Sequence, residues 1–316
     1  MAQDQEILDS ARVAVCSRSF SSDSLLRSNL ESRYSNVKYN ETGGLLVGQD
    51  LVEFASGCTK IIVGLETIDE ALLTQLPELK VISKYGVGLD AIDLQALRRF
   101  GVSLGWKGGL NKRAVSELVL SQVIAVLRKT VKSREALYNG VWQQDRGWQL
   151  SNKTVGLIGC GNIGKDVVRL LQPFDCEILV YDKVSYHKFY AEFDVTAVSL
   201  DELLARSDVV SLHVPLDQST KNILGCEQLK KLKNGAIVVN AARGGLLDEN
   251  CLIELLSSGK LGGAVLDVFE LEPPKNLNSL KLDNLLITSH IGGSSNEAIR
   301  AMGLAAIDGL DVNSIP

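Results

Sequence analysis

Short apolar runs alternate with amphipathic stretches over the first third of the chain. The apolar runs have the length of buried strands, and the stretches between them carry the spacing of helices. They predict strands at residues 12–16, 60–64, 80–83 and 102–105, and helices at 51–55 and 68–76. The serine-rich stretch 17–24 predicts a turn. This alternation is typical of βαβ units built around a mainly parallel sheet.

The alternation resumes at Lys153 and continues almost to the last residue. Six strands are expected in this part, beginning with the run from Val155 and continuing at 177–181, 208–212, 236–240, 263–267 and 284–288. Helices are expected at 200–205, 226–232 and 249–257, with a last helix at 296–309. Six strands with helices between them match the number in a complete doubly wound dinucleotide-binding domain.

One long amphipathic segment, residues 111–130, separates the two sets of strands. Its apolar positions recur about every 3.6 residues, and Asn111 can cap its first turn. The polar stretch 139–151 that follows, with Trp142 and Trp148, predicts an irregular arm. The sequence therefore predicts two α/β units with a helix between them.

The first strand of the second set ends in a turn with the spacing G-x-G-x-x-G, at Gly159, Gly161 and Gly164. A strand, a tight turn and a helix start allow backbone N–H groups to approach a pyrophosphate. The spacing alone is a weak signal, because glycine-rich turns are common. Asp182 strengthens it, since it ends the next strand, 18 residues after Gly164. An acidic side chain at that place can bind the ribose hydroxyls of a dinucleotide.

Composition narrows the possible classes of protein. The 316 residues carry a net charge of −5, which argues against a general nucleic-acid or membrane-surface role. No apolar run approaches the roughly 18–20 residues that span a bilayer, and the first residues lack the features of a signal peptide. Six scattered cysteines without a CxxC pair predict reduced, mostly packing residues of a cytosolic protein, with no metal site or disulfide framework. Cys160 lies inside the glycine turn, where exposure is an open alternative, but a packing role is favoured over a redox one.

Polar groups follow successive predicted strands, where doubly wound sheets bind their ligands. Hydride transfer to a carbonyl needs a proton donor and a cation for the substrate's charge. His213 and His290 both end strands, so position alone does not choose between them, and either could be a structural histidine. Arg243 precedes two glycines that would leave its guanidinium projecting into a cleft, although a surface ion pair is the usual role of an arginine. Spacing does not decide whether Glu270 or Glu272 serves a histidine.

Taken together, the motifs resemble those of the D-isomer-specific 2-hydroxyacid dehydrogenases, and most closely the phosphoglycerate dehydrogenase-like members. They are YGVGLDAID at 85–93, the glycine turn with Asp182, SLHVPL at 211–216, NAARGG at 240–245, LDVFELEP at 266–273 and TSHIGG at 288–293. The resemblance extends from about residue 12 to residue 310. It implies two doubly wound βαβ domains: a Rossmann NAD-binding domain at residues 107–290, and a flavodoxin-like substrate domain at 1–106 and 291–316.

The resemblance also implies a role for individual residues. Arg243 would bind and polarise a 2-oxo acid, His290 would be the general acid or base, and Glu272 would pair with that histidine. The residues implied in cofactor binding are Gly159, Gly161, Asn162, Ile163, Gly164, Asp182, His213, Pro215, Ala241, Ala242, Arg243, Asp267, His290, Gly292 and Gly293. Those implied in substrate binding are Gly86, Val87, Gly88, Asn111, Arg243 and His290. No metal is implied.

The expected function is that of an NAD-dependent oxidoreductase interconverting a D-2-hydroxy acid and its 2-oxo acid. A substrate like 3-phosphoglycerate, or an otherwise anionic one, is expected, and a glyoxylate or hydroxypyruvate reductase is the alternative. NAD(H) is expected because Asp182 would repel the 2′-phosphate of NADP(H). By resemblance, the protein would be a cytoplasmic homodimer. A different class also stays open, because NADH-sensing, corepressor-like binding proteins share this fold and similar residues.

The chain departs from the family pattern before the long helix. It has Trp-Lys-Gly-Gly at 106–109 where many members have Asn-Thr-Pro. Exposed charges at a helix start are the simpler interpretation of the basic residues in this region. A second hypothesis is that one of them faces the distal end of the substrate and favours an anionic group there. The candidates are Lys84, Lys107, Lys112 and Arg113. Since the sequence ends at Pro316, it is also expected to lack the serine-binding regulatory domains of longer phosphoglycerate dehydrogenases.

Overall fold

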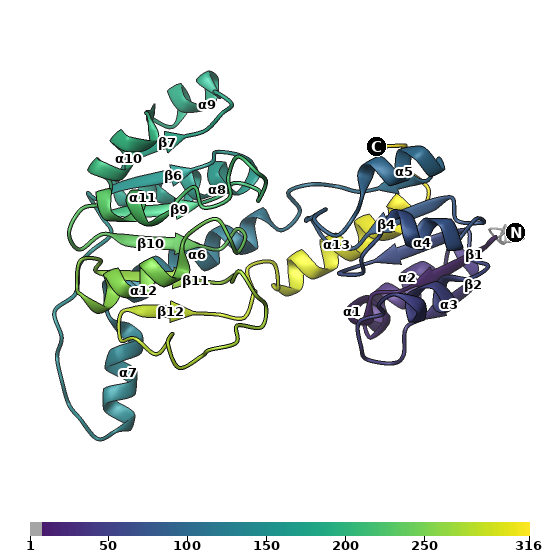
Figure 1. The fold of residues 1–316 in the computed structure, drawn as a ribbon, viewed down its shortest axis with the longest axis horizontal. Coiled ribbons are helices and arrows are strands. Elements are labelled where there is room, and N and C mark those ends of the chain that lie inside the picture. The colour runs from purple at the N-terminus through teal and green to yellow at the C-terminus, as the bar shows by residue number, and fades with distance from the viewer. Residues whose placement is uncertain (1–7) are drawn as a thin grey trace, which may run out of the picture. The chain divides into compact units, whose positions relative to one another are not determined.

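A computed structural model describes residues 8–316 of the chain. The chain divides into two compact units (Figure 1). Unit 1 runs to Asn111 and includes Asn296–Pro316, and unit 2 is Lys112–Ser295. Both boundaries between the units lie a few residues later in the chain than the sequence predicts. Each unit is described by itself below.

Unit 1 is a parallel sheet with helices on both faces. Its strands lie in the order β2-β1-β3-β4-β5, the doubly wound order of flavodoxin-like folds. The strands are β1 (Asp9–Val15), β2 (Tyr34–Tyr39), β3 (Lys60–Val63), β4 (Val81–Lys84) and β5 (Ser103–Gly105). The helices are α1 (Arg18–Ser21), α2 (Ser24–Glu31), α3 (Gln49–Ala55), α4 (Glu70–Gln75), α5 (Leu94–Phe100) and α13 (Asn296–Gly309). The last helix therefore returns to the first unit.

Alternating side chains of the strands supply two separate cores in unit 1. Val13 and Val15 face a cluster formed with α1, α2 and α13. Ala14 and Cys16, on the opposite face, lie in a cluster formed with α3, α4 and α5. Burial on both faces explains why the central strands appear in the sequence as continuous apolar runs.

Two expectations for unit 1 are wrong. Strand β2 was not foreseen, because it is an edge strand with only Tyr34 fully buried and so has no apolar run. The stretch 17–24 is not a turn, since it contains α1 and the start of α2. Two polar side chains start these helices: Ser17 accepts a hydrogen bond from Phe20 N, and Asp23 accepts hydrogen bonds from Leu25 N and Leu26 N.

Unit 2 is a larger parallel sheet, with strand order β12-β11-β10-β9-β6-β7-β8. Its strands are β6 (Thr154–Ile158), β7 (Glu177–Tyr181), β8 (Val195–Ala197), β9 (Val209–Leu212), β10 (Ile237–Asn240), β11 (Gly263–Leu266) and β12 (Leu285–Ile287). Its helices are α6 (Lys112–Leu127), α7 (Thr130–Tyr138), α8 (Asn162–Leu171), α9 (His187–Glu192), α10 (Leu200–Arg206), α11 (Cys226–Lys231) and α12 (Glu249–Ser257), with a 3-10 turn at Gln172–Phe174. Strand β8 is one more than the six expected. It was missed because only Val195 of its three residues is buried.

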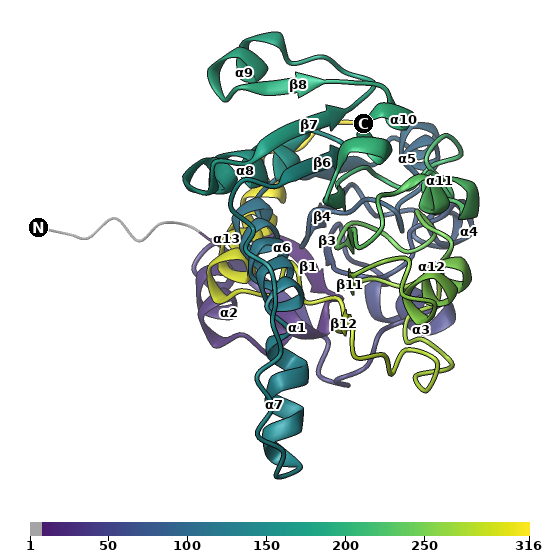
Figure 2. The same ribbon diagram turned by 90° about the vertical axis from the view of Figure 1, so that its left-hand side faces the viewer.

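Helix α6 is the long helix expected between the two sets of strands, and its buried positions include Val115, Val119 and Val123. Asn111 does not cap it, because the buried Oδ1 of Asn111 has no hydrogen-bond partner. Helix α7 has no buried residue and extends away from the sheet of its unit (Figures 1 and 2). The segment that follows α7, from 141 to 149, is irregular, as the sequence indicates.

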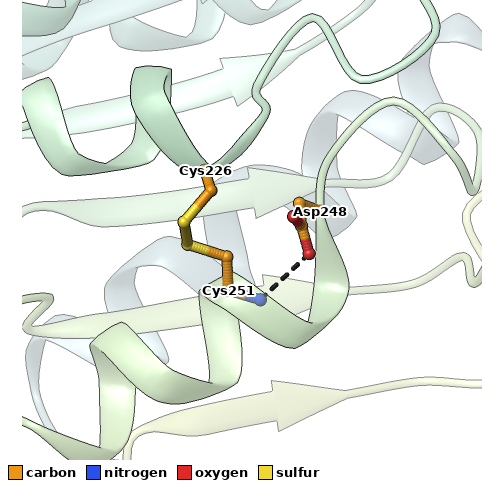
Figure 3. The surroundings of a disulfide bond; sticks show 3 residues. All are labelled: Cys226, Asp248 and Cys251. Carbon is orange, nitrogen blue, oxygen red and sulfur yellow. Dashed lines mark hydrogen bonds between the residues drawn. A yellow bond between two sulfur atoms is a disulfide. The ribbon is translucent and has the colours of Figure 1, made fainter.

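The expectation that all cysteines are reduced is wrong. Cys226 and Cys251 form a disulfide, with their Cα atoms 5.5 Å apart (Figure 3). Cys226 is the first residue of α11 and Cys251 the third of α12. These neighbouring helices bring together two residues that are 25 positions apart, so no short motif marks the pair. Cys160 is also not exposed: it is fully buried, and burial raises the pKa of its thiol to about 11.

Removing this disulfide should measurably destabilise the protein. In the chain-entropy description, a bond that closes a loop of this length lowers the free energy of the folded state, relative to the unfolded state, by about 3 kcal/mol. The variant with Cys226→Ser and Cys251→Ser should therefore unfold at a lower urea concentration than the oxidised wild type. The wild type in excess reductant should match the variant. Equal midpoints for the oxidised wild type and the variant would contradict the prediction.

Candidate active site

The glycine turn connects β6 to α8 at the carboxyl edge of the unit 2 sheet. Gly159 has a φ of 99°, which side-chain-bearing residues rarely adopt. A Cβ on Gly164 would lie 2.3 Å from the carbonyl oxygen of Gly159, so the turn itself requires glycine at both places. A Cβ on Gly161 would instead meet nothing within 4 Å. The space above Gly161, at the start of α8, fits a ligand that approaches the backbone, such as a pyrophosphate.

Asp182 directly follows β7 and is connected to the glycine turn by a hydrogen bond. Its Oδ2 accepts from Cys160 N at 2.6 Å, and its Oδ1 accepts from Val184 N at 2.8 Å. The turn lies at the topological switch point, because β6 is flanked by β7 on one side and β9 on the other. Doubly wound sheets bind dinucleotides at this point.

Arg243 lies in a turn after β10 that a buried asparagine shapes. The side chain of Asn240 donates to the carbonyl oxygen of Arg243 at 2.8 Å and accepts from Ala242 N at 3.1 Å. The guanidinium of Arg243 donates to the carbonyl oxygen of Ala242 at 2.7 Å. A Cβ on Gly244 would lie 1.9 Å from the carbonyl oxygen of Phe269. Glycine therefore allows the Arg243 turn to pack against the segment that leads to Glu272.

Glu272 is the carboxylate that contacts His290. Its Oε2 lies 2.7 Å from His290 Nδ1, while its Oε1 accepts from Phe269 N at 3.1 Å. The two side chains are 38% and 49% exposed, so both a fixed carboxylate and solvent access are available to the ring. The choice that spacing left open between Glu270 and Glu272 therefore goes to Glu272; the backbone N of Glu270 donates to Glu249 Oε1. Burial raises the pKa of the Glu249 carboxyl.

The backbone of His290 has a φ of 55°, in the left-handed region. Its N–H donates to the carbonyl oxygen of Asp267 at 2.8 Å. The fully buried carboxylate of Asp267 accepts from Ile291 N and Gly292 N, each at 2.8 Å. The sequence placed Asp267 among the cofactor-binding residues but gave no sign that its carboxylate holds the histidine loop.

The other two histidines have different environments. His213 Nε2 lies 2.9 Å from Ser211 Oγ, while its buried Nδ1 has no partner. Burial lowers the pKa of His213 to about 4, so its ring is neutral at physiological pH. His187 is exposed, with Nδ1 3.2 Å from Ser185 Oγ. Strand position did not choose between His213 and His290, but environment does, because only His290 has a carboxylate partner.

The remaining candidates in unit 2 lie in the same loops. Asn162 and Ile163 begin α8, and Pro215 is exposed after β9. Ala241 is buried in the Arg243 turn, and Gly293 follows the residues held by Asp267. The structure therefore brings the cofactor candidates of unit 2 to consecutive strand ends of one sheet.

The substrate-binding candidates of unit 1 are described separately. Gly86, Val87 and Gly88 follow β4, and Trp106 Nε1 donates to the carbonyl oxygen of Val87 at 3.0 Å. Gly86 has a φ of 135°, which explains a glycine at the start of this loop. Asn111 is the last residue of unit 1 before α6.

Two of the four basic candidates have partners in the protein. Lys84 is buried and its Nζ donates to the carbonyl oxygen of Gly64. Arg113 donates to the buried carboxylate of Asp166 at 3.1 Å and so connects α6 to α8. Lys107 and Lys112 are exposed.

No group of three or more His, Cys, Asp or Glu side chains among residues 8–316 could hold a metal ion. No helix in the described part of the chain is both long and apolar enough to cross a bilayer.

Comparisons with known proteins agree with this arrangement. The family model of the D-isomer specific 2-hydroxyacid dehydrogenase NAD binding domain matches residues 120–292. A hydroxypyruvate reductase from Thermotoga maritima is 40% identical over 235 residues, which are 73% of this chain and 76% of that protein. A D-3-phosphoglycerate dehydrogenase from Methanocaldococcus jannaschii is 37% identical over 262 residues, which are 82% of this chain but only 50% of that protein.

A solved structure of similar fold is that of a glyoxylate reductase from Paecilomyes thermophila. It has a TM-score of 0.83 and 27% identity, covering 95% of this chain and 94% of that chain. The family model spans more than half of the chain, and the T. maritima relative is 40% identical over 73% of it. The chain therefore belongs to the D-isomer-specific 2-hydroxyacid dehydrogenase family.

Proposed function

We propose that this protein interconverts a D-2-hydroxy acid and its 2-oxo acid with NAD(H). The observation that carries the proposal is the His290–Glu272 pair, at 2.7 Å, at the same sheet edge as the glycine turn and Asp182. The open space above Gly161 fits a dinucleotide pyrophosphate at the start of α8. When bound, NAD(H) supplies or accepts the hydride at the substrate's C2.

Side chains of this protein transfer the proton and bind the charge of the substrate. In reduction, His290 gives a proton from Nε2 to the carbonyl oxygen, and in oxidation it takes that proton back. Glu272 orients the ring through Nδ1. Arg243 binds the carboxylate and polarises the carbonyl of the 2-oxo acid. The family resemblance also assigns Gly86–Gly88 of unit 1 to substrate binding, and this assignment stays a prediction.

We propose a small anionic 2-oxo acid as the substrate. Relatives are called hydroxypyruvate reductase, glyoxylate reductase and D-3-phosphoglycerate dehydrogenase. Because Lys84 and Arg113 have partners within the protein, Lys107 and Lys112 are the better candidates to favour a distal anionic group.

A cytoplasmic homodimer is also part of the proposal. Three large aromatic side chains of α7 and the arm after it are exposed: Tyr138, Trp142 and Trp148. Exposed aromatic residues of this kind support burial against a second copy of the chain. The Cys226–Cys251 disulfide is unusual for the cytoplasm, so the cell compartment should be determined together with the redox state of this pair.

The test is oxidation of NADH and NADPH with glyoxylate, hydroxypyruvate, 3-phosphohydroxypyruvate and pyruvate. We expect turnover with at least one acid, and a lower KM for NADH than for NADPH, because Asp182 repels a 2′-phosphate. A preference for NADPH would contradict the role of Asp182. Tight NADH binding without turnover of any acid would favour an NADH-sensing binding protein instead.

A further inference from the structure

A row of polar side chains leads from α6 to the loop that carries His290, with Gln122 and Asp267 buried and Thr288 half-buried between them. Gln122 is 4% exposed and lies on the face of α6 that packs against the sheet. Its Nε2 donates to Thr288 Oγ1 at 3.1 Å, and Thr288 Oγ1 donates to Asp267 Oδ1 at 2.6 Å. These residues come from three separate parts of unit 2.

Gln122 is an unexpected residue for its surroundings. The neighbouring inward positions of α6, Val119 and Val123, belong to an apolar cluster. The Oε1 of Gln122 is buried without a partner, so the side chain is only half satisfied. Burying an unpaired amide oxygen costs on the order of 1–3 kcal/mol. Packing alone would therefore favour leucine or methionine, and the contact with Thr288 needs another explanation.

The chemistry of the three groups fixes the direction of their hydrogen bonds. A threonine hydroxyl has one proton, and an amide NH₂ can only donate. When Gln122 donates to Thr288 Oγ1, the single hydroxyl proton of Thr288 is directed to the carboxylate of Asp267. The carboxylate of Asp267 can only accept, so it takes this proton, and the amide donor of Gln122 stabilises that orientation of the hydroxyl.

The Asp267 carboxylate determines the path of the histidine loop. It accepts hydrogen bonds from Thr288 Oγ1, Ile291 N and Gly292 N, so donors from both sides of His290 meet on one side chain. The left-handed backbone of His290 costs about 1–2 kcal/mol, and such a conformation persists only when its surroundings determine it. A tilt of the Asp267 carboxylate would change the direction of the His290 ring.

We propose that Gln122 is a positioning residue for His290 and acts through Thr288 and Asp267. The inference rests on the acid–base role proposed for His290. Gln122 does not touch the reacting atoms. It keeps the loop in the conformation in which Glu272 meets Nδ1 and leaves Nε2 for the substrate oxygen.

Three variants test the chain of hydrogen bonds from Gln122 through Thr288 to Asp267. Gln122→Leu keeps the size and helical propensity of the side chain but removes the donor, and Thr288→Val removes the hydroxyl. Both should lower kcat about tenfold with little change in the KM for NADH, because a misdirected ring affects proton transfer more than cofactor binding. Thr288→Ser keeps the hydroxyl and should restore kcat to near the wild-type value.

Packing is tested separately from positioning. Val123→Ala removes buried volume from the same helix and should lower the Tm while keeping kcat within about twofold. Wild-type kcat in both Gln122→Leu and Thr288→Val would overturn the proposal, as would a loss of kcat in Val123→Ala equal to that in Gln122→Leu.

Hydrogen exchange gives a readout that does not depend on activity. The amides of Ile291 and Gly292 should exchange faster in Gln122→Leu and Thr288→Val than in the wild type, and those of β10 should be unchanged. If the wild type turns over no 2-oxo acid but these amides exchange faster in the variants, the proposed function fails while the positioning of the loop by Gln122 is supported. Unchanged exchange in both variants would overturn the role of Gln122.

Discussion

Replacing His290 by asparagine should lower kcat by about two to four orders of magnitude, the usual contribution of a general acid or base. Nδ1 of His290 is held by Glu272 at 2.7 Å, which leaves Nε2 as the proton donor. Asparagine is the appropriate replacement because it tolerates the left-handed backbone found here, with a φ of 55°, but cannot exchange a proton at physiological pH. Steady-state kinetics with the best acid of the panel and an NADH binding titration measure the two effects separately.

The matched control is His187→Asn, which changes an exposed histidine outside the loops described above. It should keep kcat within about twofold of the wild type. Glu272→Gln should fall between the two, because it keeps a hydrogen-bonding group beside the ring but removes its charge. A His290→Asn variant that keeps more than a tenth of the wild-type kcat would contradict the acid–base role.

The buried strands of both units could be predicted from the sequence, and so could the edge strands β5 and β12, while the edge strands β2 and β8 could not. Strands such as β9 and β10 are buried along their whole length and appear as apolar runs. Strands β2 and β8 lie at sheet edges and have only one fully buried residue each. Neither therefore appears in the sequence as an apolar run. Their place is determined by pairing with a neighbouring strand, which a local pattern does not contain.

The same limit applies to the site. The glycine turn, Asp182, Arg243 and the pair His213 and His290 could be named as candidates because ligand-binding groups follow parallel strands. The contacts that select among them join distant parts of the chain. The Gln122–Thr288 hydrogen bond spans 166 positions, and the sequence could show only that Gln122 shares the periodic face of a long helix with apolar residues. The Cys226–Cys251 bond is hidden for the same reason.

Two buried polar residues at strand ends each hold one loop of the candidate site by hydrogen bonds to its backbone. Asn240 ends β10 and holds the turn of Arg243, and Asp267 follows β11 and holds the loop of His290. Each satisfies backbone groups that would otherwise be unpaired in a tight turn. The proposed substrate-binding cation and acid–base group are thus set by neighbouring strands of one rigid sheet, which favours a precise distance between them.

Replacing Gly161 by alanine should raise the dissociation constant for NADH at least about tenfold, or ~1.4 kcal/mol, without lowering the Tm of the free protein. A Cβ at this position meets no protein atom within 4 Å, and the φ of −75° lies outside the left-handed region that favours glycine. The fold therefore does not require glycine here. A bound pyrophosphate does, because the added methyl group would occupy the space through which the phosphates approach the backbone.

Gly164→Ala is the matched comparison within the same turn. Its Cβ would lie 2.3 Å from the carbonyl oxygen of Gly159, a backbone atom that cannot move without opening the turn. This variant should lose thermal stability whether or not NADH is present, whereas Gly161→Ala should lose only the rise in Tm that NADH produces in the wild type. Wild-type NADH affinity in Gly161→Ala would show that the pyrophosphate does not lie at the start of α8. A lowered Tm of free Gly161→Ala would show instead that glycine serves the fold at this position too.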